Sequence, residues 1–360
     1  MKKNPVSLVR ASVQKATAYH LDRHDVPVKL DQNENNLGVP ESVRADLSAA
    51  LAAVPLHRYP APGQGELRAL LAKRNDWPAD GILVGNGSDD LLHTLALSFL
   101  EPGRTALAPA PSFFAYGYNA RLMGAEVVEV PLREDLRYDA GAILAAIDEH
   151  DPAVVFLCSP NNPTGSVLEP GEIEAIVEKS GGIVALDEAY WEFCSWNARS
   201  LLDSFENLVL LRTFSKAMAM ASARIGYLLA APGLALEMRK AQQPYPLNRF
   251  SQEAAKVALD HYEEMRERAS GIVSERERLY ERLSGTSGVE VFESKANFLL
   301  FRTALGSKRT FEGLLARGVL VRDVSRHPRL SGMLRVAVGT KEENERFHAA
   351  LSEILREEAR

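Results

Sequence analysis

Four groups of polar residues in this sequence each follow a short apolar run, and their side chains could do chemistry. The groups are residues 85–90, 159–165, 187–190 and 212–216. In an open parallel sheet, ligands bind in the crevice at the carboxyl ends of the strands. The four groups therefore predict a single site, provided that the four apolar runs are strands of one sheet.

Two of these groups place an ionisable residue at the end of an apolar run. Asp187 follows four apolar residues, so we expect its carboxylate to be partly buried and to need a partner. A cation is the partner that best offsets the cost of burying the negative charge. At Lys216, loss of solvent would lower the pKa of the amine and favour its neutral, nucleophilic form. A plainer interpretation stays open for each: Asp187 could cap the next helix, and Lys216 could lie on the surface.

The Gly-rich group at residues 85–90 could bind a phosphate. It precedes a predicted helix near Ser88, and the free backbone N–H groups in the first turn of a helix attract anions. Asp89 and Asp90 would repel a phosphate, so their carboxylates must point away from it. The pattern is neither a dinucleotide fingerprint nor a P-loop. A tight turn with Ser88 as an ordinary N-cap is the alternative.

Three arginines stand where a charge is costly. Arg224 comes eight positions after Lys216, and Arg322 and Arg335 each lie in an apolar run. A buried guanidinium needs an anion, so these residues predict either anionic ligands or internal salt bridges. The sequence contains no GxSxG elbow, no HExxH motif and no set of kinase motifs, and we expect no metal site.

The elements that must position these residues indicate an α/β fold. Runs that are apolar throughout alternate with segments of helical periodicity, as is typical of a parallel sheet covered on both faces. The predicted strands are 82–84, 104–108, 126–130, 153–158, 183–186, 208–211 and 225–230, and the predicted helices between them are 88–100, 140–149 and 170–179. Ser88 and Asp139 are placed as N-caps and Pro170 as a first-turn residue.

The rest of the chain predicts a second, smaller unit. A single long helix is expected from about 251 to 283, followed by strands at 289–292, 296–301, 319–321 and 333–338 and helices at 307–316 and 341–355. We expect an N-terminal arm at 1–32 that packs with the smaller unit, a large domain at 33–245 and a small α+β domain at 246–360.

Composition restricts the class of protein. The chain has 360 residues, 46% of them hydrophobic and 25% charged, which is typical of globular proteins. A net charge of -6 without basic runs makes nucleic acid a poor partner. The two cysteines encode no disulfide framework. Because no apolar segment is long enough for a bilayer and no signal core is evident, we expect no membrane partner and a cytoplasmic protein.

Taken together, the motifs resemble those of the pyridoxal-phosphate (PLP) dependent aminotransferases of fold type I. The resemblance is carried, in order and in spacing, by residues 159–165 (SPNNPTG), 187–190 (DEAY), 215–216 (SK), 224–227 (RIGY) and Arg335. More narrowly, residues 33–35 (NEN), 57–60 (HRYP), 87–89 (GSD), Arg322 and 335–340 (RVAVGT) resemble the histidinol-phosphate aminotransferase family. The resemblance covers nearly the whole chain and implies a mostly parallel central sheet in a large domain plus a smaller α+β domain.

The resemblance implies a cofactor, PLP, and a role for each residue around it. Lys216 would hold the cofactor covalently and move the α-proton of the substrate. Asp187 would pair with the protonated pyridine nitrogen. Asn162 and Tyr190 would hydrogen-bond the ring's O3′ oxygen, and Phe113 would stack on the ring, at a position where many relatives have Tyr. The cofactor phosphate would be held by Ser215, Arg224 and the backbone amides near Gly87 and Ser88, and Asp89 would be a further cofactor-binding residue.

The resemblance also implies the substrate and the assembly. Arg322 and Arg335 would receive the anion at the far end of the substrate, with Tyr19 and Asn33 lining the same pocket. Tyr59 would reach the cofactor phosphate of the other subunit of a homodimer. The implied reaction transfers the amino group of L-histidinol phosphate to 2-oxoglutarate, giving imidazole acetol phosphate and L-glutamate, in histidine biosynthesis.

Two alternatives to this reaction stay open. The first is an aromatic amino-acid aminotransferase, and the second is a PLP-dependent threonine-phosphate decarboxylase, which would release carbon dioxide without an oxo-acid. The sequence departs from the family pattern at Asn36, where relatives often have Pro.

Overall fold

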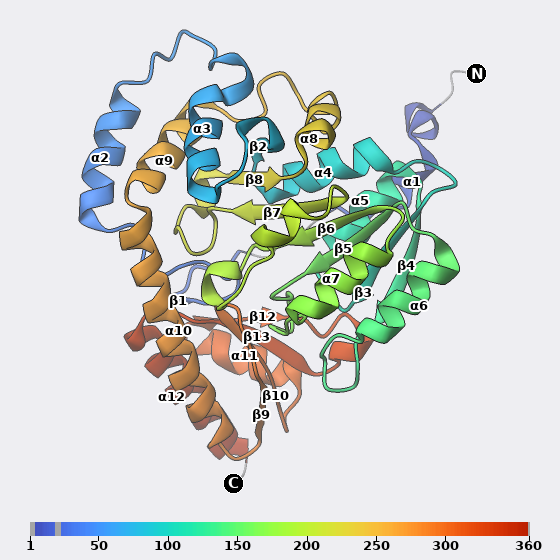
Figure 1. The fold of residues 1–360 in the computed structure, drawn as a ribbon. Coiled ribbons are helices and arrows are strands. Elements are labelled where there is room, and N and C mark those ends of the chain that lie inside the picture. The colour runs from blue at the N-terminus through green and yellow to red at the C-terminus, as the bar shows by residue number, and fades with distance from the viewer. Residues whose placement is uncertain (1–3, 19–22, 359–360) are drawn as a thin grey trace.

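A seven-stranded sheet forms the centre of the molecule in the computed structural model, which describes residues 4–18 and 23–358 (Figure 1). Its strand order is β2-β8-β7-β6-β5-β3-β4. The strands are β2 (Ile82–Asn86), β3 (Thr105–Ala110), β4 (Glu126–Pro131), β5 (Val154–Cys158), β6 (Ile183–Asp187), β7 (Leu208–Thr213) and β8 (Ile225–Leu229). Strands β4, β3, β5, β6 and β7 pair in parallel, whereas β8 is antiparallel to both β7 and β2. The prediction of an α/β fold with a mostly parallel sheet is confirmed.

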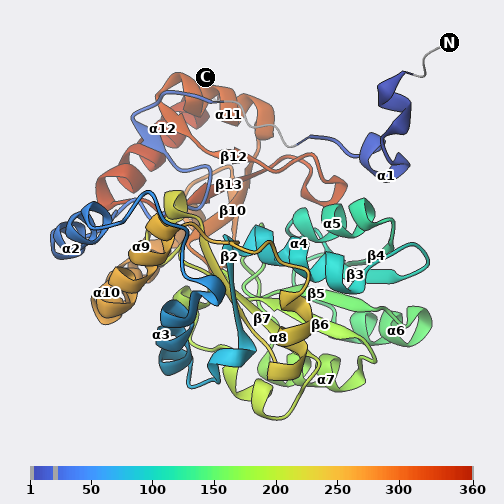
Figure 2. The same cartoon turned by 90° about the horizontal axis from the view of Figure 1, so that it is seen from above.

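The strands are apolar throughout because both faces of the sheet are buried. In β5, Val155 and Leu157 pack into one core cluster, while Val154 and Phe156 pack into another on the opposite face. A buried side chain of this size contributes about 1.5–3 kcal/mol of hydrophobic stabilisation. The first face is covered by α3 (Gly65–Asn75), α6 (Ala140–His150), α7 (Pro170–Lys179) and α9 (Arg249–Asp260), and the second by α4 (Ser88–Phe99), α5 (Ala115–Met123) and α8 (Pro232–Arg239) (Figure 2).

Local sequence signals explain where several of these helices begin. The Asp139 carboxylate accepts a hydrogen bond from the Ala142 N–H at 2.9 Å and caps α6. Pro170 is the first residue of α7, as its lack of an N–H favours. Helix α4, however, has Gly87 at its N-cap and Ser88 inside it, so the prediction of Ser88 as an N-cap was wrong.

A second, four-stranded antiparallel sheet follows later in the chain, with the order β12-β13-β10-β9. Its strands are β9 (Val289–Phe292), β10 (Phe298–Thr303), β12 (Arg322–Asp323) and β13 (Met333–Ala337). Helices α11 (Ser307–Ala316) and α12 (Lys341–Glu358) share a core cluster with this sheet. Strand β1 (Val28–Lys29) pairs in parallel with β11 (Val319–Leu320), which ties an N-terminal segment to this part of the molecule.

The long helix expected from 251 to 283 is divided into α9 and α10 (Tyr262–Ser284). The break lies at His261, whose φ of -99° and ψ of 20° are not helical. Its imidazole lies 2.7 Å from the Asp46 carboxylate of α2 (Glu41–Ala52), so a contact with a distant part of the chain accompanies the break. No Gly or Pro marks the position, so the sequence pattern did not show the break.

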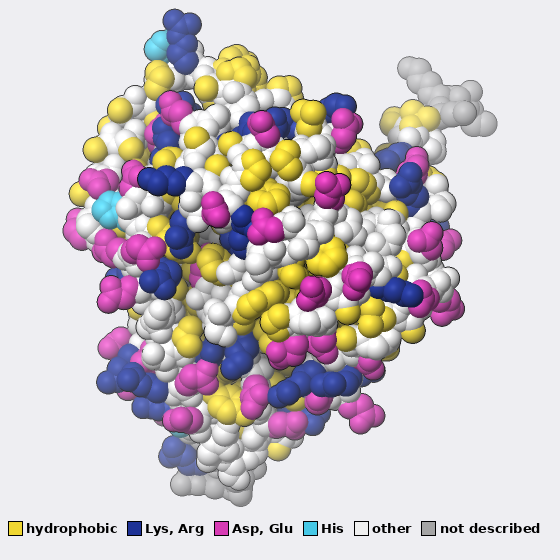
Figure 3. Space-filling view, in the orientation of Figure 1, with side chains coloured by type: hydrophobic (Ala, Val, Ile, Leu, Met, Phe, Trp, Pro, Cys, Tyr) yellow, Lys and Arg dark blue, Asp and Glu magenta, His cyan; other side chains and the backbone are white. Residues whose placement is uncertain are grey.

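Surface charge is mixed in sign over the face seen in Figure 3, where Lys, Arg, Asp and Glu side chains are interspersed. A short helix, α1 (Ala11–Gln14), lies against α5, where the Ser12 hydroxyl donates to the Leu122 carbonyl at 3.1 Å. Within the described residues, none of the helices has the length and apolar character needed to cross a membrane.

Candidate active site

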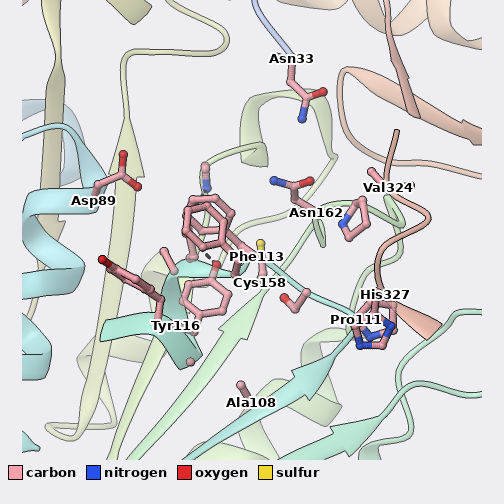
Figure 4. Close-up of a pocket in the computed structure, with 18 of the residues that line it drawn as sticks. Asn33, Asp89, Ala108, Pro111, Phe113, Tyr116, Cys158, Asn162, Val324 and His327 are labelled. Carbon is pink, nitrogen blue, oxygen red and sulfur yellow. Dashed lines mark hydrogen bonds between the residues drawn. The ribbon is translucent and has the colours of Figure 1, made fainter. Parts of the chain in front are cut away.

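The predicted polar groups meet because the elements that carry them reach one edge of the large sheet. Strands β5, β6 and β7 run parallel, so the residues after Cys158, at Asp187 and after Thr213 lie side by side. Strand β8 runs the opposite way, which brings Arg224, just before it, to the same edge, and its partner β2 ends there near Gly87. These residues line a cavity of about 980 Å³ (Figure 4).

Asp187 is a buried carboxylate at the end of β6, with 3% of its surface exposed. Its Oδ2 accepts a hydrogen bond from the Tyr116 hydroxyl at 2.8 Å, and its Oδ1 accepts one from the Ala189 N–H at 2.9 Å. Burial raises the pKa of this carboxyl to about 6. The predicted burial is confirmed, but the residues described give the carboxylate neutral donors in place of the expected cation.

Lys216 follows Ser215 in the turn after β7, three residues beyond Thr213; it is half-buried, and it lines the cavity. Its Nζ donates to the Gln32 carbonyl at 3.0 Å and lies 5.8 Å from the centre of the Tyr190 ring. Burial, reinforced by the positive charge of Arg335, lowers the pKa of the amine to about 8. At neutral pH roughly a tenth of such an amine is in the nucleophilic form, far more than for an exposed lysine.

The Gly-rich turn and Arg224 are built around one another. Gly87 has a φ of 83°, and a Cβ there would lie 2.4 Å from Arg224 Nη2. A Cβ on Gly226 would lie 2.4 Å from the Gly87 carbonyl carbon. Both positions therefore require glycine, which keeps the first turn of α4 close to the guanidinium.

The two carboxylates beside this turn differ in their orientation. Arg224 pairs with Asp89 at 3.1 Å and donates to the Ser215 hydroxyl at 3.5 Å. The Asp90 carboxylate turns back to accept from the Asn86 N–H at 3.1 Å. Asp90 thus points away as expected, whereas Asp89 already neutralises Arg224, so a phosphate bound here would share the guanidinium with Asp89.

Asn33, Asn162 and Tyr190 converge on the cavity through hydrogen bonds. Asn33 Nδ2 donates to the Tyr190 hydroxyl at 2.9 Å, and Asn162 Oδ1 accepts from Arg335 Nη1 at 2.6 Å. Burial raises the pKa of Tyr190, so its phenol stays protonated. The loop that carries Asn33 is tied by Asn36, whose amide donates to Glu343 at 2.8 Å. At the position where relatives often have Pro, a side-chain hydrogen bond holds this loop.

Two arginines face each other across the second sheet. Arg322 on β12 is directly opposite Arg335 on β13 in the antiparallel register. Arg335 is 7% exposed and its Nη2 donates to the Asp31 carbonyl at 2.7 Å, whereas Arg322 is half-buried and makes no ion pair with any described residue. Like charges in direct opposition destabilise a sheet. The pair is accordingly suited to an anionic ligand.

Aromatic rings close one side of the cavity. The Phe113 ring meets Tyr116 edge-on at 5.7 Å, and Tyr116 stacks on Phe156 at 5.3 Å. Figure 4 shows Phe113, Tyr116 and Cys158 near the centre of the cavity, with Asp89 on one side and Asn162 and His327 on the other.

The structure does not bring every candidate residue into this cavity. Tyr59 lies outside its lining, 82% exposed, and stacks on Tyr245 at 4.9 Å. Tyr19 lies outside the described residues. The residues that the structure brings together at the cavity are Asn33, Ser88, Asp89, Phe113, Asn162, Asp187, Tyr190, Ser215, Lys216, Arg224, Arg322 and Arg335, with Gly87 adjoining them.

Several cavity residues were not identified from the sequence. Tyr116 reaches Asp187 from 71 residues away in the chain, and its only sequence signal is its position three residues after Phe113. Arg326 and His327 line the same cavity from the loop after β12. Their proximity to Arg322 in the sequence is a signal, but without the fold it does not show which of them faces the cavity.

The residues present fit a phosphorylated pyridine aldehyde such as PLP. Asp187 offers a buried negative charge that has only neutral partners in the described part of the chain, which suits a protonated ring nitrogen. Lys216 offers an amine whose pKa is lowered, which suits an aldehyde. Arg224 beside the Gly87 turn offers the charge and the N–H groups that suit a phosphate.

Comparisons with known proteins identify the family of the chain. The family model for aminotransferase class I and II matches residues 25–351. A histidinol-phosphate aminotransferase from Cupriavidus pinatubonensis is 41% identical over 358 residues, which cover 97% of each chain. The family resemblance stated from the motifs is thereby confirmed.

Two solved structures resemble the fold closely. The histidinol-phosphate aminotransferase of Sinorhizobium meliloti, solved in complex with pyridoxal-5′-phosphate, superimposes with a TM-score of 0.88 at 25% identity, and the match covers 98% of each chain. The L-threonine-O-3-phosphate decarboxylase of Porphyromonas gingivalis matches with a TM-score of 0.81 at 26% identity, over 91% of this chain and 99% of that one.

Proposed function

Because the chain belongs to the class I and II aminotransferase family, we propose that it is a PLP-dependent enzyme that transfers the amino group of L-histidinol phosphate to 2-oxoglutarate. The products are imidazole acetol phosphate and L-glutamate, as in histidine biosynthesis. One observation carries the proposal: a single cavity joins the Lys216 amine and the Asp187 carboxylate to the opposed pair Arg322 and Arg335. The 41% identity to a histidinol-phosphate aminotransferase supports the choice of substrate.

Each residue at the edge of the large sheet has a task in this reaction. When bound, PLP supplies an aldehyde carbon that takes up the amino group and a ring that withdraws electrons. Asp187 keeps a negative charge beside the ring nitrogen, and Lys216 Nζ removes the proton from the substrate's Cα and holds it. The Tyr190 hydroxyl, oriented by Asn33, and the Asn162 amide hold the ring oxygen, while Phe113 covers one face of the ring.

The two opposed arginines serve the substrate. A planar guanidinium binds either a phosphate or a carboxylate through two parallel hydrogen bonds. Arg322 and Arg335 can therefore receive the phosphate of histidinol phosphate in one half-reaction and a carboxylate of 2-oxoglutarate in the other. Their mutual repulsion is relieved in both cases, because each ligand brings negative charge between them.

We propose further that two copies of the chain form a homodimer. Tyr59 and Tyr245 form an exposed stacked pair, and Leu56, three residues before Tyr59 in the sequence, is 77% exposed, which is typical of a surface that another protein covers. In the dimer Tyr59 would reach the partner's cofactor phosphate. Light scattering of the purified protein tests this: a dimer mass supports the proposal, and a monomer mass at micromolar concentration contradicts it.

The proposal includes the domain division and the compartment. We place an N-terminal arm at 1–32, a large PLP-binding domain at 33–245 and a small domain at 246–360, which is supported by the separation of the two sheets. Helix α9, at the start of the small domain, packs against the large sheet. A cytoplasmic location is supported by the two cysteines, which are both free.

A second candidate is decarboxylation of threonine phosphate, which the similarity to the P. gingivalis decarboxylase favours. That enzyme's substrate also carries a phosphate, which the arginine pair could bind. The two reactions differ in their products, since only the second releases carbon dioxide and needs no oxo-acid. Aromatic amino-acid transamination remains an alternative within the first reaction class.

The deciding experiment is a visible absorbance scan of the protein with PLP, before and after histidinol phosphate is added without an oxo-acid. We expect the band of the lysine-bound cofactor to disappear and the band of its amine form to grow. A band that persists with histidinol phosphate contradicts the substrate, and carbon dioxide released from threonine phosphate would then support the second candidate. Absence of any lysine-bound band contradicts the cofactor itself.

A further inference from the structure

A buried phenol, Tyr116, contacts the carboxylate on which the proposed chemistry depends. Tyr116 is 1% exposed, and its hydroxyl donates to Asp187 Oδ2 at 2.8 Å. Within the described residues, the Asp187 carboxylate accepts one side-chain hydrogen bond, which is this one, and one backbone hydrogen bond, from Ala189. The hydroxyl therefore acts on the one oxygen that the local backbone does not hold.

The direction of this hydrogen bond is fixed by the surroundings. Burial, and then the negative charge of Asp187, raise the pKa of Tyr116 well above its ordinary range, so the phenol keeps its proton. Burial makes the ionised form of Asp187 costly, and the hydrogen bond from Tyr116 is the largest influence in the opposite direction. Tyr116 thus favours the charged carboxylate in a place where burial disfavours it.

The ring of Tyr116 is also held in place. It stacks on Phe156 of β5 at 5.3 Å with an angle of 11° between the planes, and it meets Phe113 edge-on at 5.7 Å. Phe156 lies in β5 and Phe113 lies just before α5. Because these two rings hold the Tyr116 ring, the hydroxyl has little freedom to leave Asp187. Phe113 in turn is the residue proposed to cover the cofactor ring.

We propose that Tyr116 is a positioning residue that holds the Asp187 carboxylate charged and aimed at the ring nitrogen of the cofactor. The inference rests on the proposed function, because it assigns to Asp187 a protonated pyridine nitrogen as its partner. The Tyr116 hydroxyl is engaged with Asp187. It acts through Asp187, by making the negative charge available at the cofactor when the carboxylate is out of water.

A comparison of two cofactors tests the inference by binding alone. The probes are PLP and its 1-deaza analogue, in which a C–H group replaces the ring nitrogen and cannot pair with a carboxylate. We expect the wild-type protein to prefer PLP, and Tyr116→Phe to reduce that preference about tenfold, which is the effect of removing one hydrogen bond to a charged group. The variant keeps the ring and therefore the stacking on Phe156.

Tyr138→Phe is the matched control. Tyr138 is also buried, and its hydroxyl donates to the Cys158 carbonyl, beside Asp187 but without contact to it. We expect this variant to keep the wild-type preference for PLP while losing a comparable amount of thermal stability. Equal loss of preference in both variants would make the effect one of general packing and would overturn the inference.

The pH dependence of PLP binding gives a second readout. The charged carboxylate is lost as the pH falls through the pKa of Asp187, about 6 in the protein without cofactor. Removing the Tyr116 donor raises that pKa, so in Tyr116→Phe the affinity should begin to fall at a higher pH than in the wild type. An unchanged acid limb together with an unchanged preference contradicts the inference.

The failure of the inference and that of the proposed function are distinguishable. If the wild-type protein shows no preference for PLP over the deaza analogue, Asp187 does not pair with a ring nitrogen, and the proposed function loses its support. If the wild type prefers PLP and Tyr116→Phe does so equally, only the role of Tyr116 is wrong. In an Asp187→Asn background we expect Tyr116→Phe to change the preference no further, whereas a further tenfold loss there would place the effect of Tyr116 elsewhere.

Discussion

The two ends of the cavity are built in different ways. At the cofactor edge, formed by Gly87, Asp187, Ser215, Lys216 and Arg224, the groups stand within a few residues of the strands of the large sheet, and their donors and acceptors are mostly engaged within the protein. At the cationic end, formed by Arg322 and Arg335, two long side chains extend from the second sheet, and Arg322 makes no ion pair with the residues described.

This difference separates two kinds of function. A cofactor stays in place through many turnovers, so a preformed and rigid edge lowers the cost of binding it. The substrate end must receive a phosphate and then a carboxylate, and it presents two opposed guanidinium groups whose repulsion an anion relieves. Of the two, Arg335 is buried and hydrogen-bonded, whereas Arg322 makes no ion pair with a described residue. We therefore expect changes at the cofactor edge to abolish or weaken every reaction, and changes at the cationic end to alter the choice of substrate.

The largest expected effect follows from removing the amine of the cofactor edge. Lys216→Ala should lower the turnover of all amino donors by at least ~10⁴-fold and eliminate the lysine-bound absorbance band, because the base and the covalent attachment are lost together. Steady-state rates and a visible spectrum measure this. The control is Lys240→Ala, which removes an exposed lysine that follows α8 directly and pairs with Glu237; this variant should behave as wild type. Full activity of Lys216→Ala would show that the chemistry does not occur at the cofactor edge, and the proposed difference between the two ends of the cavity would be wrong.

A smaller effect is expected from filling the space behind the Gly-rich turn. In Gly226→Ala the new methyl would lie 2.4 Å from the Ser88 nitrogen and the Gly87 carbonyl carbon, so the turn must shift away from Arg224. We expect PLP affinity to fall by about tenfold or more and the free energy of unfolding to fall by about 1–3 kcal/mol, the usual cost of overpacking.

Gly233→Ala is the matched control for this change. Gly233 lies in the first turn of α8, and a Cβ there would have no neighbour within 4 Å. Dialysis of the holoenzyme followed by PLP titration, with thermal melts of the apo forms, measures both quantities. If Gly226→Ala binds PLP as tightly as Gly233→Ala, the cofactor edge tolerates distortion and is not the rigid half of the site.

The cofactor edge was more predictable from the sequence than the cationic end, for a physical reason. An apolar run that is followed closely by Asp187 or Lys216 indicates where a buried strand ends, because the strand and the functional residue are close together in the sequence. Parallel strands then bring their ends together without further information. The opposition of Arg322 to Arg335 depends on the register of two antiparallel strands, which no single run of residues encodes.

The elements that the sequence analysis missed depend on contacts from distant parts of the chain. Helix α2 buries only Val43 fully, so it has no clear apolar face, and helices α3, α5 and α8 were not identified either. The break at His261 depends on Asp46, 215 residues away. Tyr116 is a similar case, because its function is defined by Asp187 and not by its own neighbours in the sequence.

A substitution at the cationic end should sharpen the comparison. In Arg322→Gln one of the two guanidinium groups is lost, and we expect KM for histidinol phosphate to rise by about tenfold or more, with a smaller rise for an unphosphorylated aromatic donor. PLP affinity should stay within twofold of wild type. Arg302→Gln, which removes an exposed arginine paired with Glu290 on the same sheet, is the control. Equal rises in KM for both donors would remove Arg322 from phosphate recognition.

The smallest effect is on the stability of the protein without cofactor. The pKa of Lys216 is lowered from its ordinary 10.5 to about 8, so below pH 8 the folded protein holds a charge that burial disfavours. Between pH 8 and 10.5 the unfolded chain binds more protons at this residue, so its contribution to the free energy of unfolding rises with pH across that window. A shift of this size corresponds to about 3 kcal/mol for a wholly buried amine, and because Lys216 is half-buried we expect nearer 1 kcal/mol.

Replacing the amine tests this cost of the cofactor edge. Lys216→Met keeps the length of the side chain without the charge, so the apo variant should be more stable than the apo wild type at pH 7, and its advantage should shrink as the pH rises from 8 toward 10.5. Urea unfolding at several pH values measures the difference. An advantage that does not change with pH would come from packing alone. An advantage that shrinks as expected would mean that the cofactor edge bears an electrostatic cost in the protein without cofactor, which is the cost of keeping a reactive amine there.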